Sequence, residues 1–180
     1  MAGKSSTAKA LVNKLQTEGV AVELLKETTT RPKRESDYEN PEYHFVSDEE
    51  YNRKDFLASV DFNVTSGEVW RYGIEMQDFP HLGVIVSNMY AVEQLLSTHL
   101  PADLDITVFY LNVSEEEIAR RNKGDRISQV GDDVTDRIKR DIENYNKIYI
   151  IFDDFIHKIN CNGSSLESVV NLIRDSIYVY

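Results

Sequence analysis

Apolar residues recur at three- and four-residue spacing in several stretches of the chain, and this period predicts amphipathic helices. The first such stretch predicts a helix from Ser5 to about Glu18, which Gly19 would end. Two later helices open with a serine followed three residues on by a glutamate, which is the capping-box pattern. The further expected helices cover residues 48–54, 89–100, 114–121, 134–142 and 166–173.

Short apolar or alternating runs lie between these helices and predict strands. We expect strands at 20–25, at 84–86, at 106–111 and at 149–152, with a strand, turn and strand over 56–75 and a β-prone tail at 176–180. Because strands alternate with helices, the sequence predicts one α/β domain with a mainly parallel sheet.

Composition narrows the class of protein. The net charge of −11 argues against a nucleic-acid binder and against binding to an anionic membrane. No apolar run has the length of a membrane span, and the N-terminus lacks a signal-peptide core. The single cysteine, Cys161, excludes an internal disulfide and favours a reducing, cytoplasmic setting.

Phosphate chemistry is indicated at the start of the chain. Gly3-Lys4-Ser5 matches the second half of a phosphate-binding loop, in which backbone amides hold phosphates and a hydroxyl binds Mg²⁺. The helix expected from Ser5 would direct its N-terminus at anionic oxygens, as such a loop requires. The first half of the loop and the strand before it are absent, because the chain starts at Met1.

A longer pattern strengthens this interpretation. Thr29-Thr30-Arg31-Pro32-Lys33-Arg34 is followed by Glu42-Tyr43-His44-Phe45-Val46-Ser47, with Gly3-Lys4-Ser5 upstream and Tyr72-Gly73 downstream. In this combination the chain resembles the guanylate kinases. The resemblance implies a P-loop NTPase-type parallel sheet flanked by helices, a subdomain for the nucleoside monophosphate at about 27–78, and a lid at about 113–136. It also implies transfer of a phosphoryl group from ATP, with Mg²⁺, to a nucleoside or deoxynucleoside monophosphate.

Matched position by position, the resemblance implies roles for particular residues. In such a kinase catalysis is positioning and charge neutralisation, and arginine forks suit phosphate oxygens. The residues implied to bind ATP are Gly3, Lys4, Ser5 and Ser6, with Ser5 also the Mg²⁺ ligand. The residues implied to bind the monophosphate substrate are Arg31, Arg34, Tyr43, Asp61 and Tyr72. The residues implied to be catalytic are Lys4 and the lid arginines Arg126 and Arg137.

The base pocket departs from the family pattern. Glu27 replaces the serine that reads guanine, and Asp61 replaces a glutamate and is one methylene shorter. Phe152 replaces the asparagine before Asp153-Asp154. A site that hydrogen-bonds a base edge discriminates strongly, so these changes predict altered specificity, with guanine in doubt as the base.

Three explanations of the absent first strand stay open: a misassigned start, which we favour, an inactive remnant, or a tail at 177–180 that fills the vacant position. Accordingly a second function competes with the kinase. The chain would then be a catalytically impaired binding protein that keeps Arg31, Arg34 and Tyr43 to hold a nucleotide or a phosphorylated partner. The sequence leaves a homodimer open and indicates no membrane or nucleic-acid partner.

Overall fold

The computed structural model describes residues 3–39, 42–64, 67–77, 79–102, 104–121, 143 and 145–177. The chain forms two compact units, one from Met1–Val20 with Asp105–Tyr180 and the other from Ala21–Leu104. The predicted substrate subdomain, about 27–78, lies within the second unit. The predicted helix at 134–142 and most of the predicted lid lie outside the described residues.

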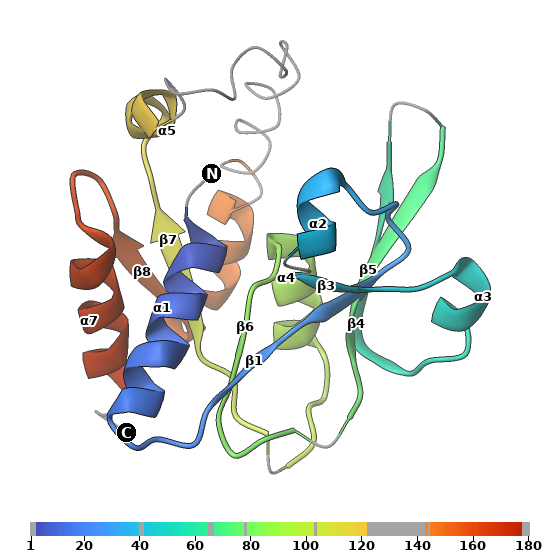
Figure 1. Cartoon of the computed structure of the whole chain (residues 1–180), viewed down its shortest axis with the longest axis horizontal. Coiled ribbons are helices and arrows are strands. Elements are labelled where there is room, and N and C mark those ends of the chain that lie inside the picture. The colour runs from blue at the N-terminus through green and yellow to red at the C-terminus, as the bar shows by residue number, and fades with distance from the viewer. Residues whose placement is uncertain are drawn as a thin grey trace. The chain divides into compact units, whose positions relative to one another are not determined.

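The first unit joins both ends of the chain (Figure 1). Its helices are α1 (Lys4–Thr17), α5 (Glu115–Arg121), the helical residues 145–152, the 3-10 turn η2 (Asp153–Phe155) and α7 (Leu166–Ile177). Strands β7 (Val108–Asn112) and β8 (Ile156–Asn160) pair in parallel. Helices α1 and α7 pack side by side, so residues from the two chain ends build one core.

Helical period explains this core. The apolar face of α1 is buried, with Leu15 fully so, and α7 buries its own apolar face. Leu111 of β7 and Ile159 of β8 lie side by side in the parallel register and are buried too. The predicted helices at 5–18 and 166–173 and the predicted strand at 106–111 are therefore confirmed, with small shifts of their ends.

The strand predicted at 149–152 is wrong, because these residues are helical. Tyr145 and Ile148 are buried three residues apart, while Ile150 and Ile151 are 79% and 64% exposed. The strand that pairs with β7 is β8, seven residues further along. The expected β-prone tail is also wrong where the structure describes it, because Ser176 and Ile177 belong to α7.

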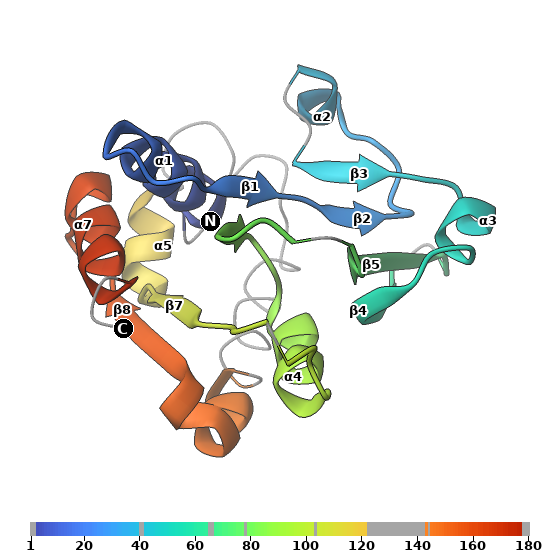
Figure 2. The same ribbon diagram turned by 90° about the horizontal axis from the view of Figure 1, so that it is seen from below.

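The second unit is built around a four-stranded sheet of order β3-β2-β5-β4 (Figure 2). These strands are β2 (Glu27–Thr29), β3 (Tyr43–Phe45), β4 (Phe56–Asn63) and β5 (Val69–Glu75). Strands β2 and β3 are parallel, whereas β5 runs antiparallel to both β2 and β4. A separate parallel pair joins β1 (Glu23–Leu25) to β6 (Gly83–Ile85). The remaining elements are α2 (Glu35–Glu39), α3 (Asp48–Tyr51) and α4 (Met89–Ser97).

Register assigns the side chains of this sheet to two faces. Opposed residues share a face and successive residues alternate. The face that we call the aromatic face carries Glu27, Thr29, Tyr43, Phe45, Val60, Phe62, Trp70 and Tyr72. The face that we call the polar face carries Thr28, His44, Ser59, Asp61, Arg71, Gly73 and Glu75.

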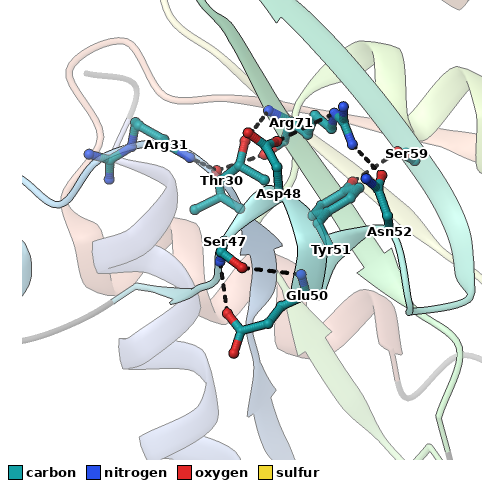
Figure 3. Close-up of polar contacts among 10 residues, drawn as sticks. Thr30, Arg31, Ser47, Asp48, Glu50, Tyr51, Asn52, Ser59 and Arg71 are labelled. Carbon is teal, nitrogen blue, oxygen red and sulfur yellow. Dashed lines mark hydrogen bonds and ion pairs between the residues drawn. The ribbon is translucent and has the colours of Figure 1, made fainter.

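Contacts on the polar face anchor α3 to the sheet (Figure 3). The expected capping box opens α3, because the Glu50 amide donates to Ser47 Oγ at 3.2 Å and the Ser47 amide donates to Glu50 Oε2 at 2.8 Å. Arg71 of β5 donates from Nη1 to Asn52 Oδ1 at 2.5 Å, and the Tyr51 hydroxyl lies 2.8 Å from Ser59 Oγ. These bonds tie α3 to the strands whose opposite face carries the aromatic residues.

Taken together the chain is a mixed α/β protein with parallel strand pairs and covering helices. Within the part of the chain that the structure describes, no helix has the length and apolar character to cross a bilayer.

Candidate functional site

Arg31 is held on the aromatic face of the second unit. Its guanidinium lies over two rings of β3, with Cζ 5.5 Å from the centroid of Tyr43 and 5.1 Å from that of Phe45. Nη2 donates to Asp37 Oδ2 at 2.9 Å and Nη1 donates to the Pro32 carbonyl at 2.8 Å. Arg31 is only 5% exposed, so this guanidinium is held by both a carboxylate and two aromatic rings.

Tyrosines 43 and 72 meet beside this guanidinium. Their ring centroids are 5.7 Å apart in an edge-to-face arrangement, and Phe62 meets Tyr72 in the same way at 5.4 Å. Burial, followed by the negative charge of Glu27, raises the pKa of Tyr43 to about 12. The phenol is therefore protonated at neutral pH and can donate a hydrogen bond to an anion.

Arg34 differs from Arg31 although it belongs to the same loop. Its side chain is exposed, and its guanidinium makes no hydrogen bond or ion pair with any residue that the structure describes. Its backbone amide donates to Asp37 Oδ2 at 2.7 Å. Burial of the Asp37 carboxyl opposes its ionisation, but hydrogen bonds from the Arg34 amide and the Arg31 guanidinium outweigh this and lower its pKa.

Asp61 does not join this group. It is opposed to Arg71 across β4 and β5, so its side chain lies on the polar face and is exposed. The structure instead brings Glu27 to the aromatic face, opposed to Tyr43. Glu27 is 4% exposed and accepts a hydrogen bond from Ser87 Oγ at 2.5 Å. Of the two carboxylates considered for the base, only Glu27 shares a face with the two tyrosines.

In the first unit, α1 begins directly after Gly3, as the phosphate-loop pattern predicts. Gly3 has φ +82° and ψ +15°, a left-handed conformation that glycine adopts at no steric cost. Lys4 and Ser6 are exposed and Ser5 is half-buried in the first turn. The first amides of a helix have no intrahelical acceptor, so this turn presents donors to an anion.

A cavity of about 260 Å³ opens at this turn. It is lined by Gly3, Ser6, Thr7, Arg120, Cys161, Ser164, Ser165, Leu166 and Val169. Both α1 and α7 begin at its wall, and hydroxyls dominate the polar lining. Lys4 and Ser5 do not line it, although they belong to the same turn.

Of the nine residues that line the cavity, only Gly3 and Ser6 were predicted site residues; Arg120 and Cys161 are two that were not. Arg120 holds the Glu117 carboxylate through two bonds of 2.7 Å. One half of the capping box predicted with Ser114 is present, because the Glu117 amide donates to Ser114 Oγ at 3.3 Å, whereas the Ser114 amide donates to Asn162 Oδ1 at 2.8 Å. Cys161 directly follows β8, whereas Asp153 and Asp154 precede that strand. The strand was predicted at 149–152 but lies at 156–160, so the sequence placed Asp153 and Asp154, rather than Cys161, directly after it. Arg126 and Arg137 lie outside the described residues.

No protein-family model and no curated protein matches the sequence. Among solved structures, the chain is similar to the crystal structure of guanylate kinase from Anaplasma phagocytophilum, with a TM-score of 0.56 and 14% identity. The aligned region covers 96% of this chain and 81% of that one. The fold is guanylate kinase-like. This agrees with the resemblance drawn from the loop at residues 29–47, although at such low identity the likeness establishes the fold alone.

Proposed function

We propose that the protein is a nucleoside monophosphate kinase that transfers a phosphoryl group from ATP to a nucleoside or deoxynucleoside monophosphate. The carrying observation is that Arg31 lies over the Tyr43 ring and Tyr43 meets Tyr72, while the exposed Arg34 belongs to the same loop as Arg31. Guanidinium and phenol groups are donors at neutral pH, and together they suit the oxygens of a phosphate monoester. The guanylate kinase-like fold supports the assignment.

The donor nucleotide is assigned to the start of α1. Gly3, Lys4, Ser5 and Ser6 would supply amides and a positive charge to the phosphates of ATP, and the neighbouring cavity would take a further part of the nucleotide. Arg126 and Arg137 stay part of the proposal as catalytic lid residues.

Magnesium fits this arrangement. Mg²⁺ keeps several waters and binds one or two protein oxygens together with substrate phosphates. The Ser5 hydroxyl in the first turn is an oxygen of that kind, and among the described residues no cluster of histidine, cysteine and acidic side chains offers a separate metal site. When bound, the ion would neutralise charge on the phosphates of ATP.

Glu27 is proposed to read the base. An ionised carboxylate only accepts hydrogen bonds, so it selects a base edge that presents N–H groups. Asp61, which was expected to read the base, lies on the polar face, and we assign it no part in specificity. We expect UMP and dTMP, whose single N3–H is flanked by two carbonyl oxygens, to be the poorest acceptors. Guanine as the preferred base stays in doubt.

The test is a panel of nucleoside and deoxynucleoside monophosphates with ATP and Mg²⁺, read by ADP formation. We expect turnover of at least one monophosphate, and a loss of about 1.5–3 kcal/mol in its binding in Arg34→Ala, the usual worth of hydrogen bonds to a charged group. Arg53→Ala is the matched control, because Arg53 is an exposed arginine of the same unit.

Two outcomes contradict the proposal in different ways. Binding of a monophosphate that depends on Arg34 without any ADP formation favours the binding protein over the kinase. Equal affinity in the Arg34→Ala variant and the unaltered chain refutes the acceptor site itself.

A further inference from the structure

The loop between β2 and α2 contains two arginines in different electrostatic states. The Arg31 charge is buried and paired with Asp37 at 2.9 Å, whereas the Arg34 guanidinium is exposed and makes no hydrogen bond or ion pair with a described residue. The charges of Arg31 and Asp37 balance, so of the two arginines only Arg34 keeps an unbalanced positive charge. Lys33, the third cation of the loop, has its Nζ 5.5 Å from the Phe45 centroid and 5.7 Å from the Tyr38 centroid. Resting on the proposed function, the difference between Arg31 and Arg34 means that the two arginines do not contribute equally to binding the acceptor phosphate.

Asp37 is the common partner of both arginines. A single oxygen, Oδ2, accepts from Arg31 Nη2 at 2.9 Å and from the Arg34 amide at 2.7 Å. The Asp37 amide donates in return to the Arg34 carbonyl at 3.0 Å, which closes the turn. Asp37 is only 8% exposed, so these bonds lie in a poorly solvated place where their geometry is well defined.

The same carboxylate also helps to fix the Arg31 guanidinium over the rings of Tyr43 and Phe45. Nη2 is fixed by Asp37 and Nη1 by the Pro32 carbonyl, while the guanidinium plane lies over Tyr43 and Phe45. A guanidinium has five N–H donors, and these bonds use two of them. The remaining donors can serve a phosphate only in the orientation that Asp37 imposes.

We infer that Asp37 is a positioning residue of the acceptor site, which orients Arg31 and the Arg34 backbone so that Arg34 delivers its unbalanced charge to the phosphate. If only the negative charge of Asp37 mattered, Asp37 would weaken phosphate binding rather than support it. A carboxylate beside two arginines reduces the attraction for a phosphate dianion, so its removal would then tighten binding. Position and charge can therefore be separated by experiment.

Two substitutions separate them with little disturbance of the fold. Asp37→Asn keeps an oxygen at the same place and removes the charge, whereas Asp37→Glu keeps the charge and moves the oxygen by one methylene. The probe is ribose 5-phosphate, a phosphate monoester without a base, titrated into the full chain and followed by phosphorus NMR. Glu35→Gln is the control, because Glu35 is an exposed carboxylate on the same helix.

Positioning predicts that Asp37→Asn binds within about threefold of the unaltered chain and that Asp37→Glu binds roughly tenfold more weakly, the usual effect of losing a charged hydrogen bond. The loss in Asp37→Glu should become smaller when Arg34 is already alanine, because only the displacement of Arg31 then remains. In turnover, Asp37→Glu should raise the acceptor KM and leave the ATP KM unchanged. Tighter binding by Asp37→Asn, or unchanged binding by Asp37→Glu, overturns the inference. Failure of the unaltered chain to bind the probe refutes the acceptor site, and the inference with it.

Discussion

Gly73 is the position at which a single methyl group should be most damaging to the second unit. It lies in the middle of β5 on the polar face, opposed to Ser59 and Thr28. A Cβ atom there would come within 2.5 Å of the Tyr51 hydroxyl and would also overlap the Phe56 ring. These two rings are stacked with centroids 4.2 Å apart, so neither can move without disturbing the other.

Three contributions set the change that Gly73→Ala makes in the free energy of unfolding. Overpacking a filled site costs about 1–3 kcal/mol. Displacement of the Tyr51 hydroxyl from Ser59 Oγ, now 2.8 Å away, costs about 0.5–1.5 kcal/mol more. In the opposite direction, alanine in a strand interior is more stabilising than glycine by roughly 0.5–1 kcal/mol. The net expectation is a loss of about 1–3.5 kcal/mol, a large part of the stability of an ordinary domain.

Urea denaturation followed by fluorescence is the appropriate assay. Trp70, the single tryptophan of the chain, lies on β5 three residues away and therefore reports on the second unit. The midpoint of Gly73→Ala should fall, and the loss should be smaller by roughly 1 kcal/mol in a Phe56→Leu background, because the ring that meets the methyl group is then smaller. A change of less than about 0.5 kcal/mol, within the usual range of surface substitutions, would refute the argument.

Two further predictions use carboxylates of the same sheet. Glu27→Gln should weaken acceptor binding and relax the preference among bases, whereas Asp61→Asn on the polar face should leave both unchanged; equal effects in a kinetic panel would contradict the assignment of faces. Burial of Glu75 opposes its ionisation, but the hydrogen bonds from Lys54 and Thr28 outweigh this and hold the Glu75 pKa below its ordinary value of 4.5. Stability should therefore be full above that value and fall as the pH drops through the lowered pKa, and Glu75→Gln should flatten this acid limb in thermal unfolding.

Local signals in the sequence were sufficient for much of the fold. The helical period of α1 and α7, the Ser47 capping box and the strand, turn and strand at 56–75 depend on nearby residues, and all are present. The apolar run at 149–152 failed because a short run does not distinguish a strand from a helix. Pairing with β7 decides the matter, and that partner is remote in sequence.

In the candidate site, too, some features could be predicted from the sequence, whereas those that depend on strand register or on a turn could not. The structure brings Arg31, Tyr43 and Tyr72, which the motif singled out, together on one face, because the strands of both tyrosines pair with β2, the strand just before Arg31. Their role in binding stays a prediction. Asp61 depended on the register of β4 against β5, where a shift of one residue moves a side chain to the other face. The ion pair between Arg31 and Asp37 depends on the geometry of a turn, which residue types alone do not specify.

The division of the chain between the two units has a consequence for biosynthesis. Residues 21–104 are contiguous, so the second unit can close its contacts while the rest of the chain is still being made. Helix α1 must wait, because the helix that packs against it, α7, is made only after residues 18–165. Until then the buried face of α1 is exposed to other hydrophobic chains. A chaperone that shields apolar segments during synthesis would therefore act on α1 rather than on the sheet beside Arg31.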